Sequence, residues 1–177
     1  MADPIRVGFL GIEHIHADYW QDVFQESPHT ELVGAWAVTP GLTESKGKEL
    51  GYKSWDDRDA LLNACDAIVM CAPTTHHAEM VELAARAGKK ILLEKPMASS
   101  TEDLDRIGAV LEETGSWLMQ AYPNRYDPIN KEIRAILDSG DLGTLSPMRI
   151  HHGHAGASSP FFGGTWYADP DLAGAAR

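Results

Sequence analysis

Residues 91–96 read Ile91-Leu92-Leu93-Glu94-Lys95-Pro96, an apolar run that stops abruptly at an acid, a base and a proline. Such a run is typical of a buried strand whose carboxyl end carries charged groups to the edge of a sheet. In an open parallel sheet that edge is where ligands bind. Lys95 is therefore a candidate to donate a proton or a hydrogen bond to a substrate oxygen, and the bond to the proline after it can be cis. A solvated pair of Glu94 and Lys95 on a loop is the alternative.

Apolar runs alternate with segments of helical periodicity on both sides of residues 91–96. Strands are expected at residues 5–10, 30–38, 52–54, 66–72, 90–93 and 117–121. Helices are expected at residues 15–24, 42–50 and 77–87, at a short segment through Leu62 that a serine or aspartate in 54–57 caps, and from a Ser99/Glu102 capping box to Glu113. This alternation predicts an α/β fold, a Rossmann-like doubly wound parallel sheet with crossover helices.

The pattern changes after Ala121. A turn-rich junction, Pro123-Asn124-Arg125-Tyr126-Asp127-Pro128, leads to an expected helix at residues 129–137. Residues 146–152 are expected to form a strand of a second sheet, and the remainder is rich in Gly, Ala and Pro without sustained periodicity. The chain is therefore predicted to hold one domain at residues 1–122 and the incomplete start of a second domain at residues 123–177.

The charge balance excludes some classes of partner. The chain of 177 residues carries 15 basic and 26 acidic residues, a formal net charge of -11, which opposes binding to nucleic acids and anionic membranes. Neither a membrane span nor the apolar core of a signal peptide is visible, so we expect a cytoplasmic protein. Cys65 and Cys71 are too few and too close in sequence for a disulfide scaffold, and both are expected to be small buried hydrophobes.

Five features occur in an order that resembles one enzyme family. They are Gly8 and Gly11 at the first strand and turn, Pro73 through His77, Glu94-Lys95-Pro96, Asn124-Arg125-Tyr126, and Trp166-Tyr167-Ala168-Asp169-Pro170 followed by Leu172-Ala173-Gly174. In this the chain resembles the Gfo/Idh/MocA oxidoreductases, which are NAD(P)-dependent sugar and polyol dehydrogenases. The resemblance implies a Rossmann domain followed by an α/β domain whose large, mostly antiparallel sheet carries the substrate on its open face.

The resemblance also implies roles for individual residues. Lys95 would be the catalytic residue, near the nicotinamide of NAD or NADP and near the substrate. The residues expected to bind the cofactor lie at or after strand ends: Gly11, Glu13, His14, Ile15, Ala37, Ala72, Pro73, His77, Glu94 and Lys95. For His77 a hydrogen bond at a helix start is the alternative. The substrate is expected to meet Lys95, Arg125 and His152, with an interdomain salt bridge as the alternative for Arg125.

Two positions depart from the dinucleotide-binding pattern. The run Gly11-Ile12-Glu13-His14-Ile15-His16 keeps only the first glycine of the fingerprint, and Glu13 would bring a carboxylate near the phosphates unless it turns away. Ala37 stands at the end of the second expected strand, where an acid normally holds the ribose hydroxyls, and no arginine is nearby. The preference between NAD and NADP is therefore not readable from the sequence.

The catalytic Asp and His that the resemblance implies after Leu172-Ala173-Gly174 have no counterpart before the sequence ends at Arg177. We therefore expect a fragment of an oxidoreductase that moves hydride between nicotinamide and a sugar, polyol or related hydroxyl compound, and we do not expect this polypeptide alone to do so. The alternative is a non-catalytic nucleotide- or sugar-binding module on a Rossmann scaffold. A homo-oligomer formed through the incomplete second sheet is a further possibility.

Histidines and aromatic residues complete the set of candidates. His152 and His154 alternate on an expected strand and share a face, but no cysteine or carboxylate completes a ligand set, so we predict no metal site. Trp20 and Trp117 are expected in the core. Trp166 and Tyr167, in a Gly-rich segment, are expected to be exposed or to pack against another chain.

Overall fold

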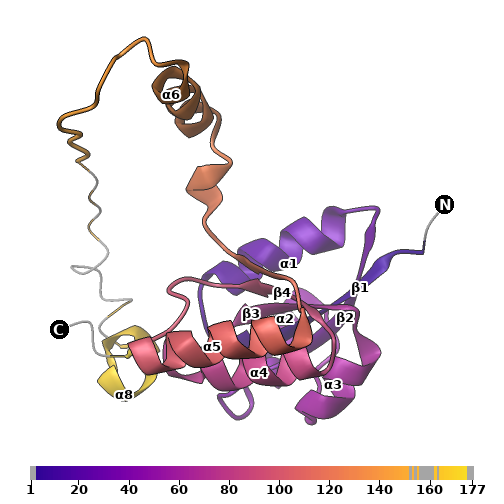
Figure 1. The fold of residues 1–177 in the computed structure, drawn as a ribbon. Helices are drawn as coiled ribbons and strands as arrows, with labels where there is room; N and C mark the ends of the chain where they lie inside the picture. Colours follow the sequence, from indigo (N-terminus) through magenta and orange to yellow (C-terminus); the bar gives the residue numbers. More distant parts are fainter. Residues whose placement is uncertain (1–2, 152, 154, 156–161, 163, 175–177) are drawn as a thin grey trace.

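The computed structural model describes residues 3–151, 153, 155, 162 and 164–174, and it confirms the predicted Rossmann-like sheet (Figure 1). The strands are all parallel and stand in the order β2-β1-β3-β4-β5. Their bounds are β1 Ile5–Ile12, β2 Thr30–Trp36, β3 Ala67–Cys71, β4 Lys90–Leu93 and β5 Leu118–Gln120. The strand order reverses direction between β1 and β3, so the crevice beyond their carboxyl ends is the place where such a sheet binds ligands.

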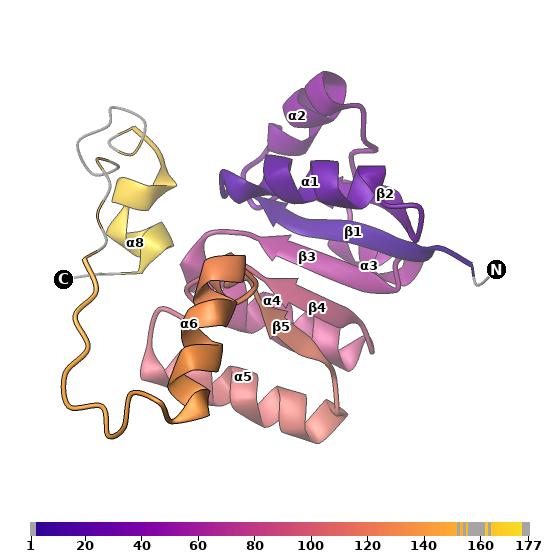
Figure 2. The ribbon, with the colours of Figure 1, turned by 90° about the horizontal axis from the view of Figure 1, so that it is seen from above.

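Helices cover both faces of the sheet, as the doubly wound prediction requires (Figure 2). Helices α1 (His16–Glu26) and α2 (Leu42–Leu50) pack with the apolar residues of one face, and α3 (Arg58–Ala64), α4 (His77–Arg86) and α5 (Thr101–Thr114) pack with those of the other. Strand β3 lies between these two layers and is buried from Ile68 to Cys71. Both cysteines are free and buried, as expected.

Of the two predicted helix caps, the one at residues 54–57 is confirmed and the one at Ser99 is not. Asp57 is the N-cap of α3, where its side chain accepts hydrogen bonds from the backbone amides of Asp59 and Ala60. The capping box at Ser99 is wrong by one residue. Ser100 holds the extended backbone of an N-cap and accepts from the Asp103 amide, while the Glu102 carboxylate accepts from the Thr101 hydroxyl instead of turning back to a capping amide.

The expected strand at residues 52–54 is also wrong. Only an isolated parallel bridge joins Ser54 to Ala35 at the outer edge of β2. Two backbone hydrogen bonds flank that bridge, from the Ala35 amide to the Lys53 carbonyl and from the Trp55 amide to the Ala35 carbonyl. The segment between α2 and α3 is short and meets β2 at a single residue, so no ladder forms.

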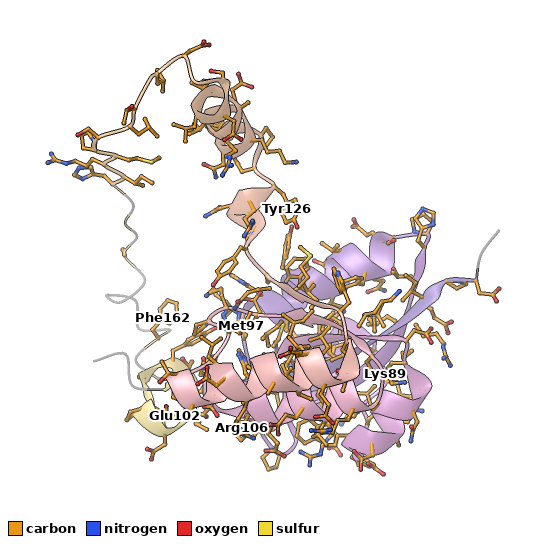
Figure 3. The ribbon with its side chains drawn as sticks, in the orientation of Figure 1. Lys89, Met97, Glu102, Arg106, Tyr126 and Phe162 are labelled. Carbon is orange, nitrogen blue, oxygen red and sulfur yellow. The ribbon has the colours of Figure 1, made fainter. Side chains whose placement is uncertain are left out.

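Beyond β5 the chain leaves the sheet. It passes through η2 (Pro123–Arg125) into α6 (Pro128–Ser139), which confirms the helix predicted there and which stands away from the sheet in Figure 1. Figure 3 shows Tyr126 on this connection. No residue of α6 is buried, and its apolar side includes Ile129, which is 71% exposed. The domain boundary near residue 122 remains a prediction.

The strand expected at residues 146–152 is not formed at residues 146–151, and His152 lies outside the described residues. A strand needs a neighbour to share its backbone hydrogen bonds, and no described segment lies beside this one as a strand. The antiparallel second sheet is therefore not present in the described part of the chain. Trp117 corrects another expectation, since it is 56% exposed rather than in the core.

The chain then returns to the edge of the parallel sheet. Its last described elements are η4 (Trp166–Ala168) and α8 (Pro170–Ala173), and the hydroxyl of Thr75 donates to the carbonyl oxygens of Asp171 and Leu172. Residues 165–174 thus lie beside η1 (Thr74–His76), which follows β3. Among the described helices none is both long enough and apolar enough to cross a membrane.

Candidate functional site

The turn after β1 requires a glycine at position 11. Gly11 has φ +87°, a region that favours glycine, and a Cβ built there would lie 2.4 Å from the Cβ of Ala72. Farther along the turn, the His14 amide donates to the carbonyl of Cys71 at 2.9 Å. These contacts hold the start of α1 directly beside the end of β3, at the point where the strand order reverses.

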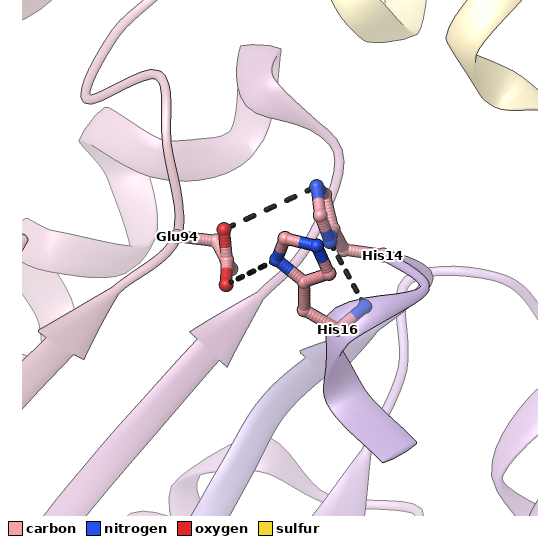
Figure 4. A group of neighbouring side chains, drawn as sticks. All are labelled: His14, His16 and Glu94. Carbon is pink, nitrogen blue, oxygen red and sulfur yellow. Dashed lines mark hydrogen bonds and ion pairs between the residues drawn. The ribbon is translucent and has the colours of Figure 1, made fainter. Parts of the chain in front are cut away.

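Glu94 follows β4 and is the buried acid of the site, with 2% of its surface exposed. One carboxylate oxygen, Oε1, lies 3.0 Å from Nδ1 of His16 (Figure 4). The same oxygen accepts from the Trp20 indole at 2.8 Å, and Oε2 accepts from the Lys95 amide at 3.1 Å. Burial alone would raise the pKa of Glu94, but the hydrogen bonds from Trp20 and His16 and the neighbouring His14 outweigh burial and lower it. Glu94 is therefore a buried carboxylate held by donors from α1 and from its own loop.

His14 lies between Glu94 and Lys95. Its Nε2 is 4.0 Å from Oε2 of Glu94 and 3.3 Å from Nζ of Lys95, and its Nδ1 accepts from the His16 amide at 3.1 Å. Burial lowers the pKa of His14 to about 4, so the ring is neutral at pH 7. Nε2 faces both Glu94 and Lys95. The Lys95 ammonium can only donate, so its contact requires Nε2 to accept, whereas the His16 amide requires Nδ1 to accept, and a neutral ring accepts at one of its two nitrogens.

His14, His16 and Glu94 are close enough to suggest a metal centre, since one ligand atom from each lies within 4.8 Å of the others. A metal bound to Nε2 of His14 would compete for that lone pair with the Lys95 ammonium, and one bound to Nδ1 would compete with the His16 amide. The Nζ atom of Lys95, 3.3 Å from Nε2, also occupies the approach. We therefore interpret the cluster as a hydrogen-bonded network rather than a metal centre.

A cavity of about 480 Å³ opens next to His14 and Lys95. Its volume lies within the range of small-molecule sites, about 300 to 1,000 Å³. The remaining lining residues come from the loops after β3 and β4 and from the last described segment: Thr74, Pro96, Trp166, Tyr167, Ala168, Pro170, Ala173 and Gly174. The Lys95–Pro96 peptide bond is cis. A larger cavity, about 620 Å³, lies on the apolar sheet face around Phe24 and Met119. None of the residues that line the 480 Å³ cavity lines this larger one.

Trp166 and Tyr167 pack on the turn after β1, which corrects the expectation that they are exposed or meet another chain. The Trp166 indole donates to the Glu13 carbonyl at 3.0 Å, and the Tyr167 hydroxyl accepts from the Ile15 amide at 3.1 Å. The two rings stack with centroids 4.1 Å apart, and Tyr167 also meets the ring of His14 edge-on. Burial raises the pKa of Tyr167 to about 12, so its hydroxyl keeps its proton.

Glu13 turns away from the start of α1. Its Oε2 accepts from the Ile12 amide at 2.9 Å, and its Oε1 accepts from the Thr39 amide, beyond the end of β2, at 2.8 Å. Ala37 is buried close by with 8% of its surface exposed and offers no polar side chain. The carboxylate of Glu13 therefore lies between the carboxyl ends of β1 and β2.

His77 is buried behind the cavity rather than among its lining residues. Its Nε2 lies 3.0 Å from the carbonyl of Ala72, and its Nδ1 lies 2.9 Å from that of Pro96. Burial lowers its pKa, which the hydrogen bonds to these carbonyls only partly offset. The side chain thus ties the loop after β3 to the loop that carries Lys95, and Pro73 is buried between Ala72 and η1.

Some of the predicted site residues lie together at the carboxyl edge of the sheet, and others do not. Of the residues predicted to bind cofactor or substrate, His14 and Lys95 line the 480 Å³ cavity. Gly11, Glu13, Ile15, Ala72 and Glu94 lie on the turn after β1 and on the loops after β3 and β4, in contact with residues of this cavity or with each other. Arg125 lies exposed in η2 and is not among the residues that line the 480 Å³ cavity, and His152 is outside the described residues. The sequence analysis missed Tyr167 as a partner of α1 and Trp20 as the donor to Glu94. For Tyr167 the only signal in the sequence was its place in the family-like motif Trp166-Tyr167-Ala168-Asp169-Pro170. Trp20 gave no signal, because it looked like any core tryptophan on an amphipathic helix.

Comparison with known proteins agrees with this geometry. A family model described as "Oxidoreductase family, NAD-binding Rossmann fold" matches residues 5–122. An inositol 2-dehydrogenase from Rhizobium meliloti is 36% identical over 148 residues, which covers 82% of this chain and 44% of that protein. A dTDP-3,4-didehydro-2,6-dideoxy-alpha-D-glucose 3-reductase from Actinomadura kijaniata is 31% identical over 150 residues, covering 81% of this chain and 44% of the relative.

A solved structure gives the same result. The 3-ketoreductase from Actinomadura kijaniata, in complex with TDP-benzene and NADP, superposes with a TM-score of 0.67 at 28% identity, covering 81% of this chain and 45% of that one. The chain thus spans less than half the length of the relatives it matches. The family model covers well over half of the chain, from β1 to the end of β5. The chain belongs to the Gfo/Idh/MocA oxidoreductase family, with an NAD-binding Rossmann fold.

Proposed function

We propose that this chain is the cofactor-binding part of an NAD(P)-dependent oxidoreductase that moves hydride between nicotinamide and a sugar, polyol or related hydroxyl compound. The observation that carries the proposal is the place of Lys95, which lines the 480 Å³ cavity beside His14 at the carboxyl edge of the sheet. Relatives named as inositol and deoxysugar oxidoreductases support the substrate class. A place in the cytoplasm and a homo-oligomeric state remain predictions from the sequence.

The residues at the crevice fit a dinucleotide. Gly11 lets β1 and the loop after β3 approach closely at the switch point, and the Glu13 side chain is directed away from the start of α1. The Tyr167 hydroxyl occupies an acceptor position on the Ile15 amide, which is where a helix N-terminus would offer its amide to a phosphate oxygen. We infer that a bound pyrophosphate exchanges with this hydroxyl. The nicotinamide ring would then be held near His14 and Lys95 and would supply the hydride-transfer chemistry.

Lys95 is the residue we expect to touch the substrate. Its amide is hydrogen-bonded to Glu94, its Nζ is near His14, and its side chain lines the cavity. From there Nζ can donate to the oxygen of the carbon that exchanges hydride and so orient it. The buried carboxylate of Glu94 stabilises a positive charge on the neighbouring groups.

One observation favours a second function, a non-catalytic nucleotide- or sugar-binding module. The first amides of α1 already have acceptors inside the chain: Ile15 donates to Tyr167, His16 donates to Nδ1 of His14, and Ala17 donates to the His14 carbonyl. A helix start whose amides at residues 15–17 already have acceptors offers fewer donors to a phosphate. Under this second function, a small polar ligand would occupy the cavity without a dinucleotide.

Calorimetric titration of the folded chain with NADH and then with NADPH separates the two functions. We expect saturable binding of at least one dinucleotide. No binding by a chain that circular dichroism shows to be folded would reject the cofactor role and leave the binding module.

The role of Lys95 needs a separate variant. In a form of the protein that turns substrate over, Lys95→Ala should lower turnover far more than the affinity for the dinucleotide, because the lysine acts on the substrate oxygen. Lys90→Ala, which changes an exposed lysine at the other end of β4, is the matched control. Unchanged turnover in Lys95→Ala would reject the role of the lysine.

A further inference from the structure

The Glu13 carboxylate is held in place by two backbone donors, one at the end of β1 and one in the loop after β2. The Ile12 amide belongs to the end of β1, and the Thr39 amide follows β2, the strand beside it in the sheet. Each oxygen of a carboxylate has two lone-pair directions, so one further acceptor position remains on each oxygen. The side chain is only partly buried, which leaves those positions accessible. Glu13 is thus a pre-oriented acceptor at the β2 side of the crevice.

In dinucleotide-binding sheets an acid at the end of the second strand accepts hydrogen bonds from the ribose of the adenosine half. In this chain β2 ends at Trp36, and the next residue, Ala37, has no polar side-chain atom. Residues 37–43 contain no acid at all. The carboxylate of Glu13, from the turn after β1, reaches this loop and accepts from the backbone amide of Thr39.

The charges around this place oppose a second phosphate group. The buried hydroxyl of Tyr52 has its pKa raised well above the usual value, first by burial and then by the carboxylates of Asp18, Glu49 and Glu13. The carboxylates of these three acids therefore all act on one hydroxyl. The ammonium of Lys46 is 2.7 Å from Asp18 and is committed to it. Residues 37–45, which form the loop after β2 and the first turn of α2, contain no lysine or arginine.

We propose that Glu13 selects NAD over NADP. Its carboxylate accepts hydrogen bonds from the two ribose hydroxyls of the adenosine half of NAD, and it repels the 2′-phosphate that replaces one of these hydroxyls in NADP. The position that holds a glycine in the usual fingerprint thereby takes over the role of the absent acid on β2. This inference rests on the proposed function, because it presumes that the crevice binds a dinucleotide.

The test compares the affinities of NADH and NADPH for three forms of the chain by calorimetry. The unchanged chain should bind NADH at least ~10-fold more tightly than NADPH, since placing like charges together costs several kcal/mol. Glu13→Gln keeps the length of the side chain but removes the charge, and it should reduce the ratio of the two affinities by about 10-fold, mainly by improving the binding of NADPH. Glu26→Gln, the same change at the opposite end of α1, should leave the ratio unaltered because it alters net charge only.

Glu13→Asp is a second variant that tests the same role of Glu13 if the Glu13→Gln variant does not fold. It keeps the charge but shortens the side chain, so it should weaken NADH binding while NADPH stays the poorer ligand. Equal affinity of the unchanged chain for both dinucleotides, or an unchanged ratio in a folded Glu13→Gln variant, would overturn the selection by Glu13 and leave the proposed function standing. Binding of neither dinucleotide to the unchanged chain would overturn both.

Discussion

The Nε2 atom of His14 lies 3.3 Å from the Nζ atom of Lys95, although the two residues are 81 positions apart in the chain. The turn after β1 and the loop after β4 meet here because β1, β3 and β4 are parallel neighbours whose carboxyl ends share one edge. The contact joins the Gly11–His16 run, which departs from the dinucleotide fingerprint, to the Glu94-Lys95-Pro96 motif. Its surroundings lead to four predictions.

The first prediction concerns pH. Burial lowers the pKa of His14 from 6.5 to about 4, so the folded chain binds this proton more weakly than the unfolded chain does. The stability that depends on neutral His14 is fully present above pH 6.5 and is lost as the pH falls toward 4, by up to about 3 kcal/mol. His14→Gln removes this titration and should lose less stability over the same interval.

Urea unfolding at pH 7 and at pH 4.5 measures this difference. His29→Gln replaces an exposed histidine and serves as the control. The lowered pKa of Glu94 acts in the same direction but at lower pH, below its ordinary value of 4.5, so the comparison stops there. An equal loss of stability in His14→Gln and in the unchanged chain would contradict the prediction.

The second prediction concerns the hydrogen bond from Trp20 to Glu94. Trp20→Phe keeps most of the apolar ring but removes the donor to a buried carboxylate, so unfolding free energy should fall by about 1.5 to 3 kcal/mol. Trp36→Phe is the matched control, because that half-buried indole makes no hydrogen bond with the described residues. Losses of equal size in the two variants would mean that ring volume, and not the hydrogen bond, accounts for the effect.

The third prediction separates two glycines. Gly11→Ala adds a Cβ where Ala72 lies 2.4 Å away and where φ is +87°, so we expect a loss of stability of more than about 2 kcal/mol. Gly108 lies within α5, where an added Cβ meets nothing within 4 Å, and Gly108→Ala should stabilise the chain by about 1 kcal/mol. Thermal unfolding of the two variants should therefore shift in opposite directions. A Gly11→Ala variant as stable as the unchanged chain would show that β1 and β3 can separate at no cost.

The fourth prediction concerns Tyr167 and cofactor binding. Tyr167→Phe removes the hydroxyl that accepts from the Ile15 amide and leaves that amide free for a phosphate oxygen. Since a hydrogen bond contributes about 0.5 to 1.5 kcal/mol, NADH should bind up to about 10-fold more tightly. Tyr19→Phe, on an exposed tyrosine of α1, controls for the loss of a hydroxyl. Weaker binding in Tyr167→Phe would mean that the hydroxyl belongs to the cofactor site instead of competing with it.

Much of the fold is visible in the sequence because it depends on local patterns. The four residues of β4, from Lys90 to Leu93, are predicted without error, and α4 is predicted to within one residue, because each is a short apolar run or periodic segment with a clear end signal. The capping box failed by one position because Ser99 and Ser100 are both good caps, and only the backbone angles distinguish them. The strand at residues 146–151 failed because β-branched and apolar content does not supply a neighbouring strand.

The residues of the candidate site likewise fall into those that local sequence reveals and those that depend on tertiary contacts. Lys95 is recognisable at its strand end from residues 91–96 alone, since a strand that stops at charge and proline must bring them to the sheet edge. The direction of the Glu13 side chain is not recognisable in the sequence, because it depends on the amide of Thr39 in the loop after the neighbouring strand β2. The contact between Ile15 and Tyr167 spans 152 residues and depends on where the chain returns after α6.

Periodicity and end signals are properties of neighbouring residues, so the order of strands and helices and the place of Lys95 follow from the amino acids themselves. The partners of Glu13, of Glu94 and of the start of α1 come from segments that only the packed sheet brings together, where burial and competing hydrogen bonds choose among several acceptors. For that reason the sequence reveals where this protein has its crevice, and the packing determines which charges and donors face into it.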